Sequence, residues 1–314
     1  MEQKINLPPT YKQMIEEMGK QLQLRKSLLF KRVLFITWPI LLLIISGYGF
    51  QAVYDLETLP VEKQTWVIGV ATVYIICSII YSMIVGFIFE IEKRIWIDSF
   101  FDQKNLDSTT SWRIAKKLFW PGFKFRLQIL WRYYLIPMGL ATLIVGGIVV
   151  GVFKQATMSI SQDNIIMVAL VSFILLIIGL TIYSYYIKTK LRYAWFIFLD
   201  TFGVSYSFVN FVAEMEKLNT ISKSETFKKS LIATVGTDSV RDLAGVAIGT
   251  LSFAMSHLGG AGKMLGQLAS VYGNELSRQA TDLGNITAQY LIYRFARKEL
   301  VGSEQVVNEA LYRL

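Results

Sequence analysis

Four long stretches that carry no charged side chain constrain the fold of this chain more than any other feature of its sequence. They cover residues 33–54, 64–89, 133–153 and 164–187. A helix crosses about 30 Å of hydrocarbon with about 20 residues, at a rise of about 1.5 Å per residue. Helix is favoured over strand because a helix satisfies its own backbone hydrogen bonds in lipid, and because runs such as residues 40–45 lack the alternation of a membrane barrel. The sequence therefore predicts an all-α integral membrane bundle of four spans.

The distribution of basic residues predicts how these spans are oriented. Of the 32 Lys and Arg residues, 30 lie in residues 1–32, 90–132 and 188–314, whereas the two short connections carry only Lys63 and Lys154. Segments rich in Lys and Arg tend to remain on the cytoplasmic side. We therefore expect a multi-pass protein of the cell membrane, which is the inner membrane in a bacterium. Its N-terminal segment, its interfacial loop, its helical tail and both termini should be cytoplasmic.

The formal net charge of +9 suits either nucleic acid or anionic lipid. Because the basic residues lie beside the four-span region 33–187, anionic lipid headgroups are the expected partner and nucleic acid is not expected. Within the loop, residues 112–120 separate apolar from basic side chains at helical spacing, which predicts an amphipathic helix in the interface plane. Pro121 and Gly122 should end this helix, and a second basic and aromatic stretch follows. The residues expected to face headgroups are Arg113, Lys116, Lys117, Lys124 and Arg126.

Glycines in the third uncharged stretch favour close helix packing. Gly147 and Gly151 have the four-residue spacing that lets two helices approach each other, and Gly139 lies two turns earlier. Packing within this bundle is the favoured interpretation, and self-association between copies is the alternative.

Asp200 is the one charged residue in the apolar stretch 193–213. An ionisable group in such a stretch is costly and is often functional. The hydroxyl residues that follow it favour a helix cap or an interfacial turn instead. Asp200 is therefore a candidate for a functional carboxylate, with the cap as the favoured interpretation.

The tail contains an uncharged, glycine-rich segment over residues 243–262. The segment is long enough to be a fifth span, but its glycines and hydroxyls also suit a re-entrant segment or a tightly packed helix. A crossing there would place six basic residues outside, so we expect the tail to remain inside.

Beyond this segment, apolar side chains recur every three or four residues and form one stripe of an amphipathic helix. Such a stripe must dock on the chain's own core, on a protein partner or another copy, or on the bilayer surface. The members of this tail stripe are Leu265, Leu268, Tyr272, Leu276, Leu283 and Ile286.

The chain offers few groups for catalysis, with one histidine, His257, and one cysteine, Cys77. The two lie in segments assigned to different places, so neither has a catalytic companion, and a disulfide or cysteine-rich metal site is not expected. Residues 259–263 resemble the end of a phosphate-binding loop, but Met264 stands where that loop needs a Ser or Thr to hold magnesium. We expect no cofactor, no metal and no enzymatic activity.

Three strings of basic and aromatic residues carry a resemblance to a known family. They are SWRIAKKLFW at residues 111–120, LRYAWFIFLD at 191–200 and YLIYRF at 290–295. In these strings the chain resembles bacterial multi-pass proteins similar to the membrane domain of glycerophosphoryl diester phosphodiesterases. The resemblance implies spans that alternate with interfacial helices, usually six spans, and no catalytic residues, because that membrane domain is not the hydrolytic one.

Together these patterns favour a non-catalytic membrane protein. The expected function is a membrane anchor or scaffold subunit that engages a partner, or further copies of itself, through the cytoplasmic tail. The alternative is a channel or pore-forming protein in which residues 243–262 line or plug the conduit.

Overall fold

The computed structural model describes residues 8–54, 59–102, 106–156, 162–201 and 208–301. Within these ranges the chain is helical and contains no β-strand, so the all-α prediction is confirmed. Four of its helices are long and apolar enough to cross a membrane, as the sequence predicts. They lie within Tyr11–Gln51, Val61–Phe101, Phe119–Ile144 and Leu170–Thr201.

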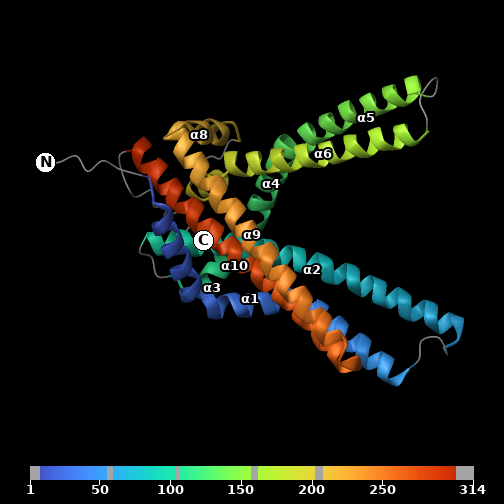
Figure 1. Cartoon of the computed structure of the whole chain (residues 1–314). Coiled ribbons are helices and arrows are strands. Elements are labelled where there is room, and N and C mark those ends of the chain that lie inside the picture. Colours follow the sequence, from blue (N-terminus) through green and yellow to red (C-terminus); the bar gives the residue numbers. More distant parts are fainter. Residues whose placement is uncertain (1–7, 55–58, 103–105, 157–161, 202–207, 302–314) are drawn as a thin grey trace. The chain divides into compact units, whose positions relative to one another are not determined.

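The chain divides into two compact units, which are described separately (Figure 1). Unit 1 comprises residues 1–119 and 193–314, and unit 2 comprises residues 120–192. The helices of unit 1 are α1 (Tyr11–Val53), α2 (Val61–Phe101), α3 (Ser108–Lys117), α7 (Ala194–Thr201), α8 (Phe208–Thr220), α9 (Lys223–Ser256) and α10 (Gly259–Val301). Unit 2 holds α4 (Phe119–Leu130, apart from its first residue), the π-helix η2 (Trp131–Leu135), α5 (Ile136–Ala156) and α6 (Gln162–Lys190).

The helix α1 joins the polar N-terminal segment to the first candidate span without a break. It begins with a capping box, in which the Thr10 hydroxyl accepts a hydrogen bond from the Gln13 backbone N–H at 3.2 Å and the Gln13 side chain accepts one from the Thr10 N–H at 2.8 Å. Pro39 lies inside the apolar half of this helix. Because proline has no N–H, it cannot donate to the carbonyl of Phe35, four residues earlier. The Tyr81 hydroxyl of α2 donates to that carbonyl at 3.2 Å instead.

The same arrangement recurs in unit 2. Pro137 cannot donate to the carbonyl of Tyr133, which lies four residues earlier in η2. The Tyr183 hydroxyl of α6 donates to this carbonyl at 2.8 Å. In both units a tyrosine of the following candidate span therefore compensates a proline in the preceding one, and this hydrogen bond ties the two helices together.

The interfacial loop departs from the sequence prediction at one point. Asp107 caps α3 by accepting from the Thr110 N–H at 3.0 Å, but the helix ends at Lys117 and α4 starts at Phe119. The break expected at Pro121 and Gly122 was therefore placed a few residues too late. Pro121 lies in the first turn of α4, where a missing N–H costs nothing because those N–H groups have no acceptor in the helix.

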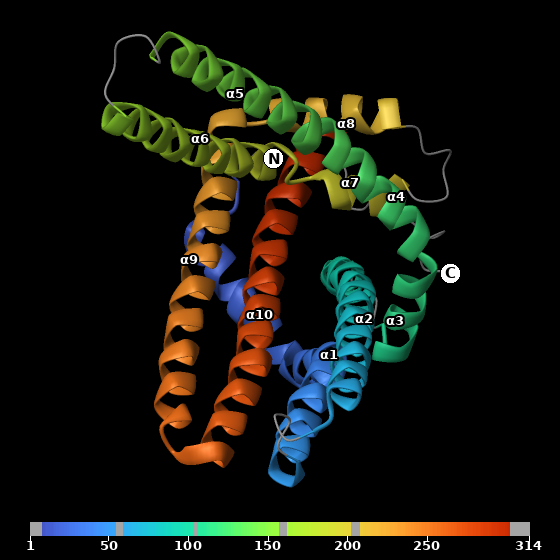
Figure 2. The ribbon, with the colours of Figure 1, turned by 90° about the vertical axis from the view of Figure 1, so that its right-hand side faces the viewer.

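The tail of the chain forms a long antiparallel hairpin of α9 and α10 (Figures 1 and 2). Residues 243–262 are not a separate element, because they cover the second half of α9, the turn and the first residues of α10. The turn requires glycine at Gly259, whose φ is +86°. At Gly266 an added Cβ would lie 2.7 Å from the Ser252 carbonyl oxygen, so the missing side chain lets the two helices touch.

Contacts along α10 define how it lies against its neighbours in unit 1. The Tyr272 hydroxyl donates to the Phe30 carbonyl of α1 at 3.2 Å, and Gly284, twelve residues further along, faces Met18, twelve residues earlier in α1. The register of α10 against α1 is thus antiparallel and constant. Against α9, Asn274 lies opposite Gly245 in the hairpin.

Candidate functional site

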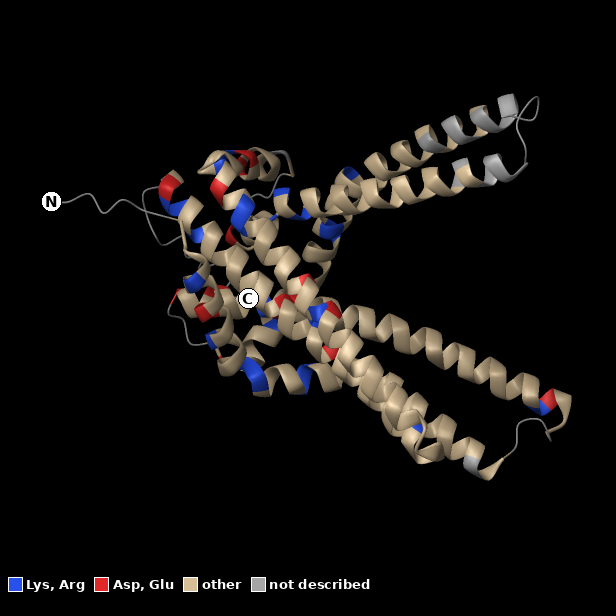
Figure 3. Ribbon diagram, viewed as in Figure 1, with Lys and Arg blue, Asp and Glu red and all other residues tan. Residues whose placement is uncertain are grey.

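A row of polar side chains joins α10 to the C-terminal parts of α2 and α7 and to the middle of α8, and we call this row the α10 seam. It consists of Lys93, Asp98, Asp200 and Glu214 on one side and of Gln279, Asp282, Tyr290, Tyr293 and Arg297 on α10. Charged ribbon segments are concentrated in this part of unit 1, whereas the outer halves of α1 and α2 are nearly free of them (Figure 3). The seam brings together titratable side chains from four helices of unit 1, which makes it the candidate functional site.

The first contact of the seam holds a buried ammonium group. Lys93 is fully buried, and its Nζ donates to the Gln279 side-chain oxygen at 2.6 Å and lies 3.4 Å from a carboxylate oxygen of Asp282. An isolated buried charge would cost several kcal/mol, so the amide and the carboxylate are needed to keep Lys93 in this place. The contact of Lys93 with Gln279 and Asp282 joins α2 to α10.

Two tyrosine–aspartate pairs form the centre of the seam. The Tyr290 hydroxyl donates to Asp98 at 2.7 Å, and the Tyr293 hydroxyl donates to Asp200 one turn further along α10. The ring of Phe196 packs against both phenols, with ring centroids 5.0 Å from Tyr290 and 5.3 Å from Tyr293. Both tyrosines are buried, so the paired carboxylates satisfy hydroxyls that would otherwise lose their hydrogen bonds.

The surroundings of these phenols oppose their ionisation. Burial, and then the Asp98 carboxylate, raises the pKa of Tyr290 well above its ordinary value. Burial, and then the Asp200 carboxylate, does the same to the pKa of Tyr293. The two phenols therefore act as hydrogen-bond donors throughout the physiological range.

A second polar cluster lies beside the seam, where α1, α2 and α3 meet. The Arg32 guanidinium donates to both carboxylate oxygens of Glu92 at 2.9 Å, which is the paired geometry that arginine and carboxylate prefer. The Ser111 hydroxyl donates to Glu92 at 3.1 Å and accepts from the Trp96 indole N–H at 2.9 Å. Glu92, Trp96 and Ser111 are fully buried, so this cluster fixes the amphipathic helix α3 to the inner end of α2.

Asp200 is the residue of the seam that the sequence singled out as a candidate functional group, whereas Tyr290 and Tyr293 were noted only within the string YLIYRF. It lies inside α7, next to the last residue, and accepts from Tyr293, so within the described residues it does not cap the start of a helix. The remaining members were missed because they are ordinary polar residues far apart in the sequence. A repeat in the sequence would have pointed to Asp98: Ile-Tyr-Ser is followed by Asp-Ser-Phe in residues 80–100 and by Asp-Thr-Phe in residues 182–202.

This repeat relates the compensating tyrosines to the seam. Tyr81 precedes Asp98, and Tyr183 precedes Asp200, by the same seventeen residues. Each copy thus carries a tyrosine whose hydroxyl donates to the carbonyl that a proline four residues later leaves without its helical N–H donor. Each copy also carries an aspartate that accepts a hydrogen bond from a tyrosine hydroxyl of α10. The pairs with Tyr290 and Tyr293 therefore bind equivalent positions of the two copies to a single helix.

The tail stripe divides into a buried and an exposed half. Leu283 and Ile286 are buried against the chain itself, Leu268, Tyr272 and Leu276 are half-buried, and Leu265 is 49% exposed. The half nearest the C-terminus thus docks on the chain's own core, and the half near the hairpin turn does not dock completely.

The other residues singled out in the sequence lie outside the seam. The side chains expected to meet headgroups, Arg113, Lys116, Lys117, Lys124 and Arg126, are exposed on α3 and α4. An added Cβ at Gly139, Gly147 or Gly151 would meet nothing within 4 Å among the described atoms, so the proposed packing role of these glycines remains a prediction. His257 and Cys77 are exposed. The described ranges contain no group of three or more His, Cys, Asp or Glu side chains that could hold a metal ion.

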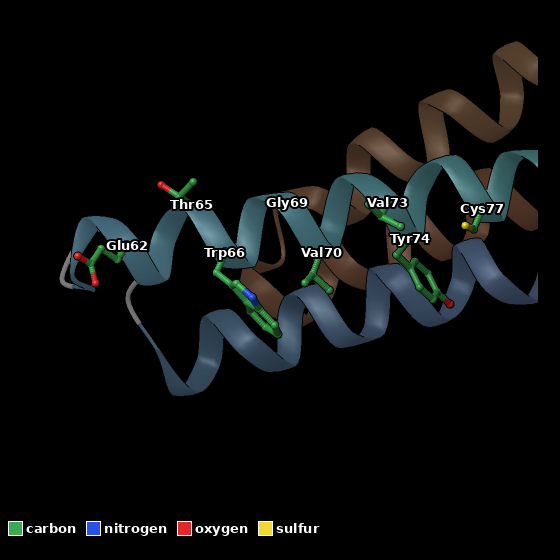
Figure 4. Close-up of a pocket in the computed structure, with 8 residues that line it drawn as sticks. All are labelled: Glu62, Thr65, Trp66, Gly69, Val70, Val73, Tyr74 and Cys77. Carbon is green, nitrogen blue, oxygen red and sulfur yellow. The ribbon is translucent and has the colours of Figure 1, made fainter.

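An open groove of about 740 Å³ runs along the outer half of α2. All of its lining residues belong to this one helix: Glu62, Thr65, Trp66, Gly69, Val70, Val73, Tyr74 and Cys77. Figure 4 shows Trp66, Val70 and Tyr74 on one side of α2, and the Tyr74 hydroxyl donates to the Pro39 carbonyl of α1 at 3.0 Å. The groove is mainly apolar and lies on one candidate span, so we interpret it as a lipid-facing flank.

No protein-family model matches this chain, and the comparisons with curated proteins and with solved structures found no match either. The resemblance to the membrane domain of phosphodiesterases therefore rests on the three strings alone. The function must be argued from the geometry of the chain.

Proposed function

We infer that this chain is a non-catalytic multi-pass membrane protein that serves as an anchor or scaffold for a protein partner at the cytoplasmic membrane surface. The α10 seam supports this role because it ties both copies of the repeat to one helix and so makes the inner part of unit 1 rigid. The polar side chains of the seam are engaged with one another, as expected of a structural tie. A rigid body of this kind can present a surface at a constant place above the membrane.

The outer face of α9 provides that surface and is the observation that carries the proposal. Ile232, Val235 and Val240 are 46%, 41% and 59% exposed. Their spacing of three and eight residues places them on one side of the helix. Large apolar side chains gathered in this way on a surface mark an interaction site more often than scattered single residues do. We call these three residues the α9 face.

Lipid does not cover the α9 face if the uncharged stretch of α1 begins at the membrane boundary. By the registers of α10 against its two neighbours, Thr250 of α9 lies level with Val33 of α1. At about 1.5 Å per residue, Val240 then lies about 15 Å and Ile232 about 27 Å on the cytoplasmic side of that level. The headgroup layer is only about 5–8 Å thick, so a protein partner is the better occupant.

The chemistry of the partner follows from the residues beside this face. Lys228 is exposed one turn before Ile232 and adds a positive charge at its edge. The partner is therefore expected to present an apolar strip with an acidic group at one end.

A pair of charge substitutions tests the proposal. Changing Val235→Glu and Val240→Glu together places two carboxylates on the α9 face, whereas Ser224→Glu adds one to an exposed polar position of the same helix. Complexes would be cross-linked in native membranes through a photoreactive residue at position 232 and then sized by native mass spectrometry. We expect the doubly substituted protein to lose its partner while Ser224→Glu keeps it, with equal membrane insertion. The same complex in both variants, or no cross-linked complex in the unmodified protein, would contradict the scaffold role.

The alternative of a pore receives less support from the geometry. An added Cβ at Gly249, Gly259 or Gly260 would meet nothing within 4 Å among the described atoms. Gly262 of the segment, and Gly266 and Gly273 just beyond it, however, face the atoms of α9 and its turn, where an added Cβ would lie within 2.3 to 3.2 Å of them. Glycines used in this way bring the two helices of the hairpin together and do not line a conduit. A ring of identical copies in the native mass spectrum would reopen that alternative.

A further inference from the structure

The charges of the α9–α10 hairpin stop at the same level on both helices. Asp242 is the last charged residue of α9 before the turn, Glu275 is the first after Lys263 on α10, and both lie within one turn of the contact between Gly245 and Asn274. From this level to the turn the hairpin carries only the charge of Lys263. In Figure 3 the outer part of the hairpin is correspondingly almost free of charged segments.

The outer part of the hairpin lies beside the first candidate span. From the contact between Tyr272 and Phe30, thirteen residues along α10 lead to Gly259 at the turn, and thirteen residues along α1 lead to Leu43. Leu43 is ten residues, or about 15 Å, beyond Val33, where the uncharged stretch of α1 begins. The turn therefore lies at about half the depth of a hydrocarbon layer of about 30 Å. Both views show α1 continuing past the turn of the hairpin (Figures 1 and 2).

The side chains at this depth are suited to acyl chains. Leu243, Val246, Phe253 and Leu258 are exposed by 71%, 69%, 68% and 76%. In water, exposure of this extent on one continuous surface would be costly, at about 25 cal/mol for each Å² of apolar surface. Lipid would cover these side chains, and the adjacent first candidate span, in α1, is expected to lie in lipid as well.

The hairpin is too short to cross the membrane. The uncharged part of α9 runs from Leu243 to Ser256, which gives fourteen residues and a length of about 21 Å. A crossing needs about 30 Å. The chain also reverses direction at Gly259 and returns along α9, so both ends of the hairpin remain on one side.

We propose that residues 243–274 form a re-entrant helical hairpin, which enters the cytoplasmic leaflet beside the first span, turns near mid-membrane and meets lipid acyl chains with its outer face. The backbone hydrogen bonds within α9 and α10, and those from the His257 and Leu258 N–H groups to the Ala254 and Met255 carbonyls at the turn, meet the requirement that backbone inside lipid be hydrogen-bonded within the protein. Glycine lets the two helices pack closely. Lys263 lies four residues, or about 6 Å, back from Gly259 toward the cytoplasm, and its flexible side chain can extend to the headgroups. The proposal does not depend on the scaffold role, because the α9 face lies outside this segment.

Labelling of single cysteines tests the depth of the turn. Cys77, the one native cysteine, is first replaced by serine, and Leu258→Cys is introduced at the turn. Ser224→Cys marks the exposed start of α9, and Leu59→Cys marks the first outer connection. A membrane-impermeant maleimide is applied to sealed vesicles of each orientation. We expect Ser224→Cys to react from the cytoplasmic face only, Leu59→Cys from the opposite face only, and Leu258→Cys from neither face until detergent is added.

A spin label at the same position distinguishes burial in lipid from burial in protein. On Leu258→Cys it should collide more often with oxygen, which concentrates in the bilayer centre, than with a water-soluble nickel complex. The highly exposed Phe253→Cys serves as a second site, so that one failed variant does not decide the result. Reaction of both sites from the cytoplasmic face would place the hairpin in water, and reaction from the opposite face would make it a crossing. Either result, or a spin label shielded from oxygen, would overturn the proposal.

Discussion

Close packing of α9 against α10 predicts opposite effects for two glycine substitutions within the same hairpin. An added Cβ at Gly266 would lie 2.7 Å from the Ser252 carbonyl oxygen and 3.4 Å from the Met255 Cβ. The backbone oxygen cannot rotate away, so Gly266→Ala must push the helices apart. At Gly249, on the other helix, an added Cβ would meet nothing within 4 Å.

The expected magnitudes follow from these two environments. Overpacking costs about 1–3 kcal/mol. The hydrogen bond from the Ser252 hydroxyl to the Gly266 carbonyl, 2.8 Å long, adds about 0.5–1.5 kcal/mol if it breaks. Replacing glycine by alanine inside a helix returns about 0.5–1 kcal/mol. Gly266→Ala should therefore lower the free energy of unfolding by about 0.5–4 kcal/mol, and Gly249→Ala should raise it by up to about 1 kcal/mol.

Unfolding of the purified protein in mixed micelles, driven by a rising fraction of sodium dodecyl sulfate and followed by circular dichroism, measures both changes. The unmodified protein and the two variants are compared at the same detergent concentration. If Gly266→Ala proved as stable as Gly249→Ala, the two helices would not touch at this glycine. The register on which the depth of the hairpin rests would then be wrong as well.

Two further predictions concern the buried polar groups of unit 1. Glu92→Gln should lower the free energy of unfolding by about 3–5 kcal/mol in the same assay, because it leaves the Arg32 guanidinium without its carboxylate partner. The exposed Glu62→Gln should change it by no more than about 0.5 kcal/mol, and equal effects would refute the pairing. Because the pKa of Tyr293 is raised in the folded chain, its contribution to stability is complete below a pH of about 10 and is lost as the pH rises from there through the folded pKa. The difference in tyrosinate absorbance between the unmodified protein and Tyr293→Phe should thus appear only at a pH above the ordinary pKa of tyrosine. A difference that titrates near pH 10 would contradict the buried pair of Tyr293 and Asp200.

The membrane class and the existence of the four apolar helices could be predicted from the sequence because lipid imposes a simple rule on both. Charge must be absent over a fixed length, and the backbone must be helical. The end of the amphipathic helix was harder to place, because Pro121 breaks a helix interior but is tolerated in a first turn. Local sequence does not reveal which of these positions a proline will occupy.

The tail could be predicted only in outline for a different reason. An uncharged segment with several glycines satisfies both a lipid surrounding and close helix packing, so residues 243–262 left three interpretations open. The three interpretations differ in how far the segment reaches along the first candidate span, and the contact of Tyr272 with Phe30 supplies this register. The seam was likewise hidden, because Tyr290 reaches Asp98 across 192 residues of sequence. The repeat that contains Asp98 and Asp200 is the feature of the seam that can be recognised in the sequence.

Four crossings with both chain ends on the cytoplasmic side are the arrangement on which the proposed scaffold and re-entrant hairpin both depend. The most direct test is a set of fusions in which a reporter that is active on one side only follows Leu59, Ser159, Asn105 or the C-terminus. Because 30 of the 32 basic residues lie in segments assigned to the cytoplasm, we predict an outside position after Leu59 and Ser159 and an inside position after Asn105 and at the C-terminus. A C-terminal reporter found outside would contradict the account, because the α9–α10 hairpin would then have to cross the membrane.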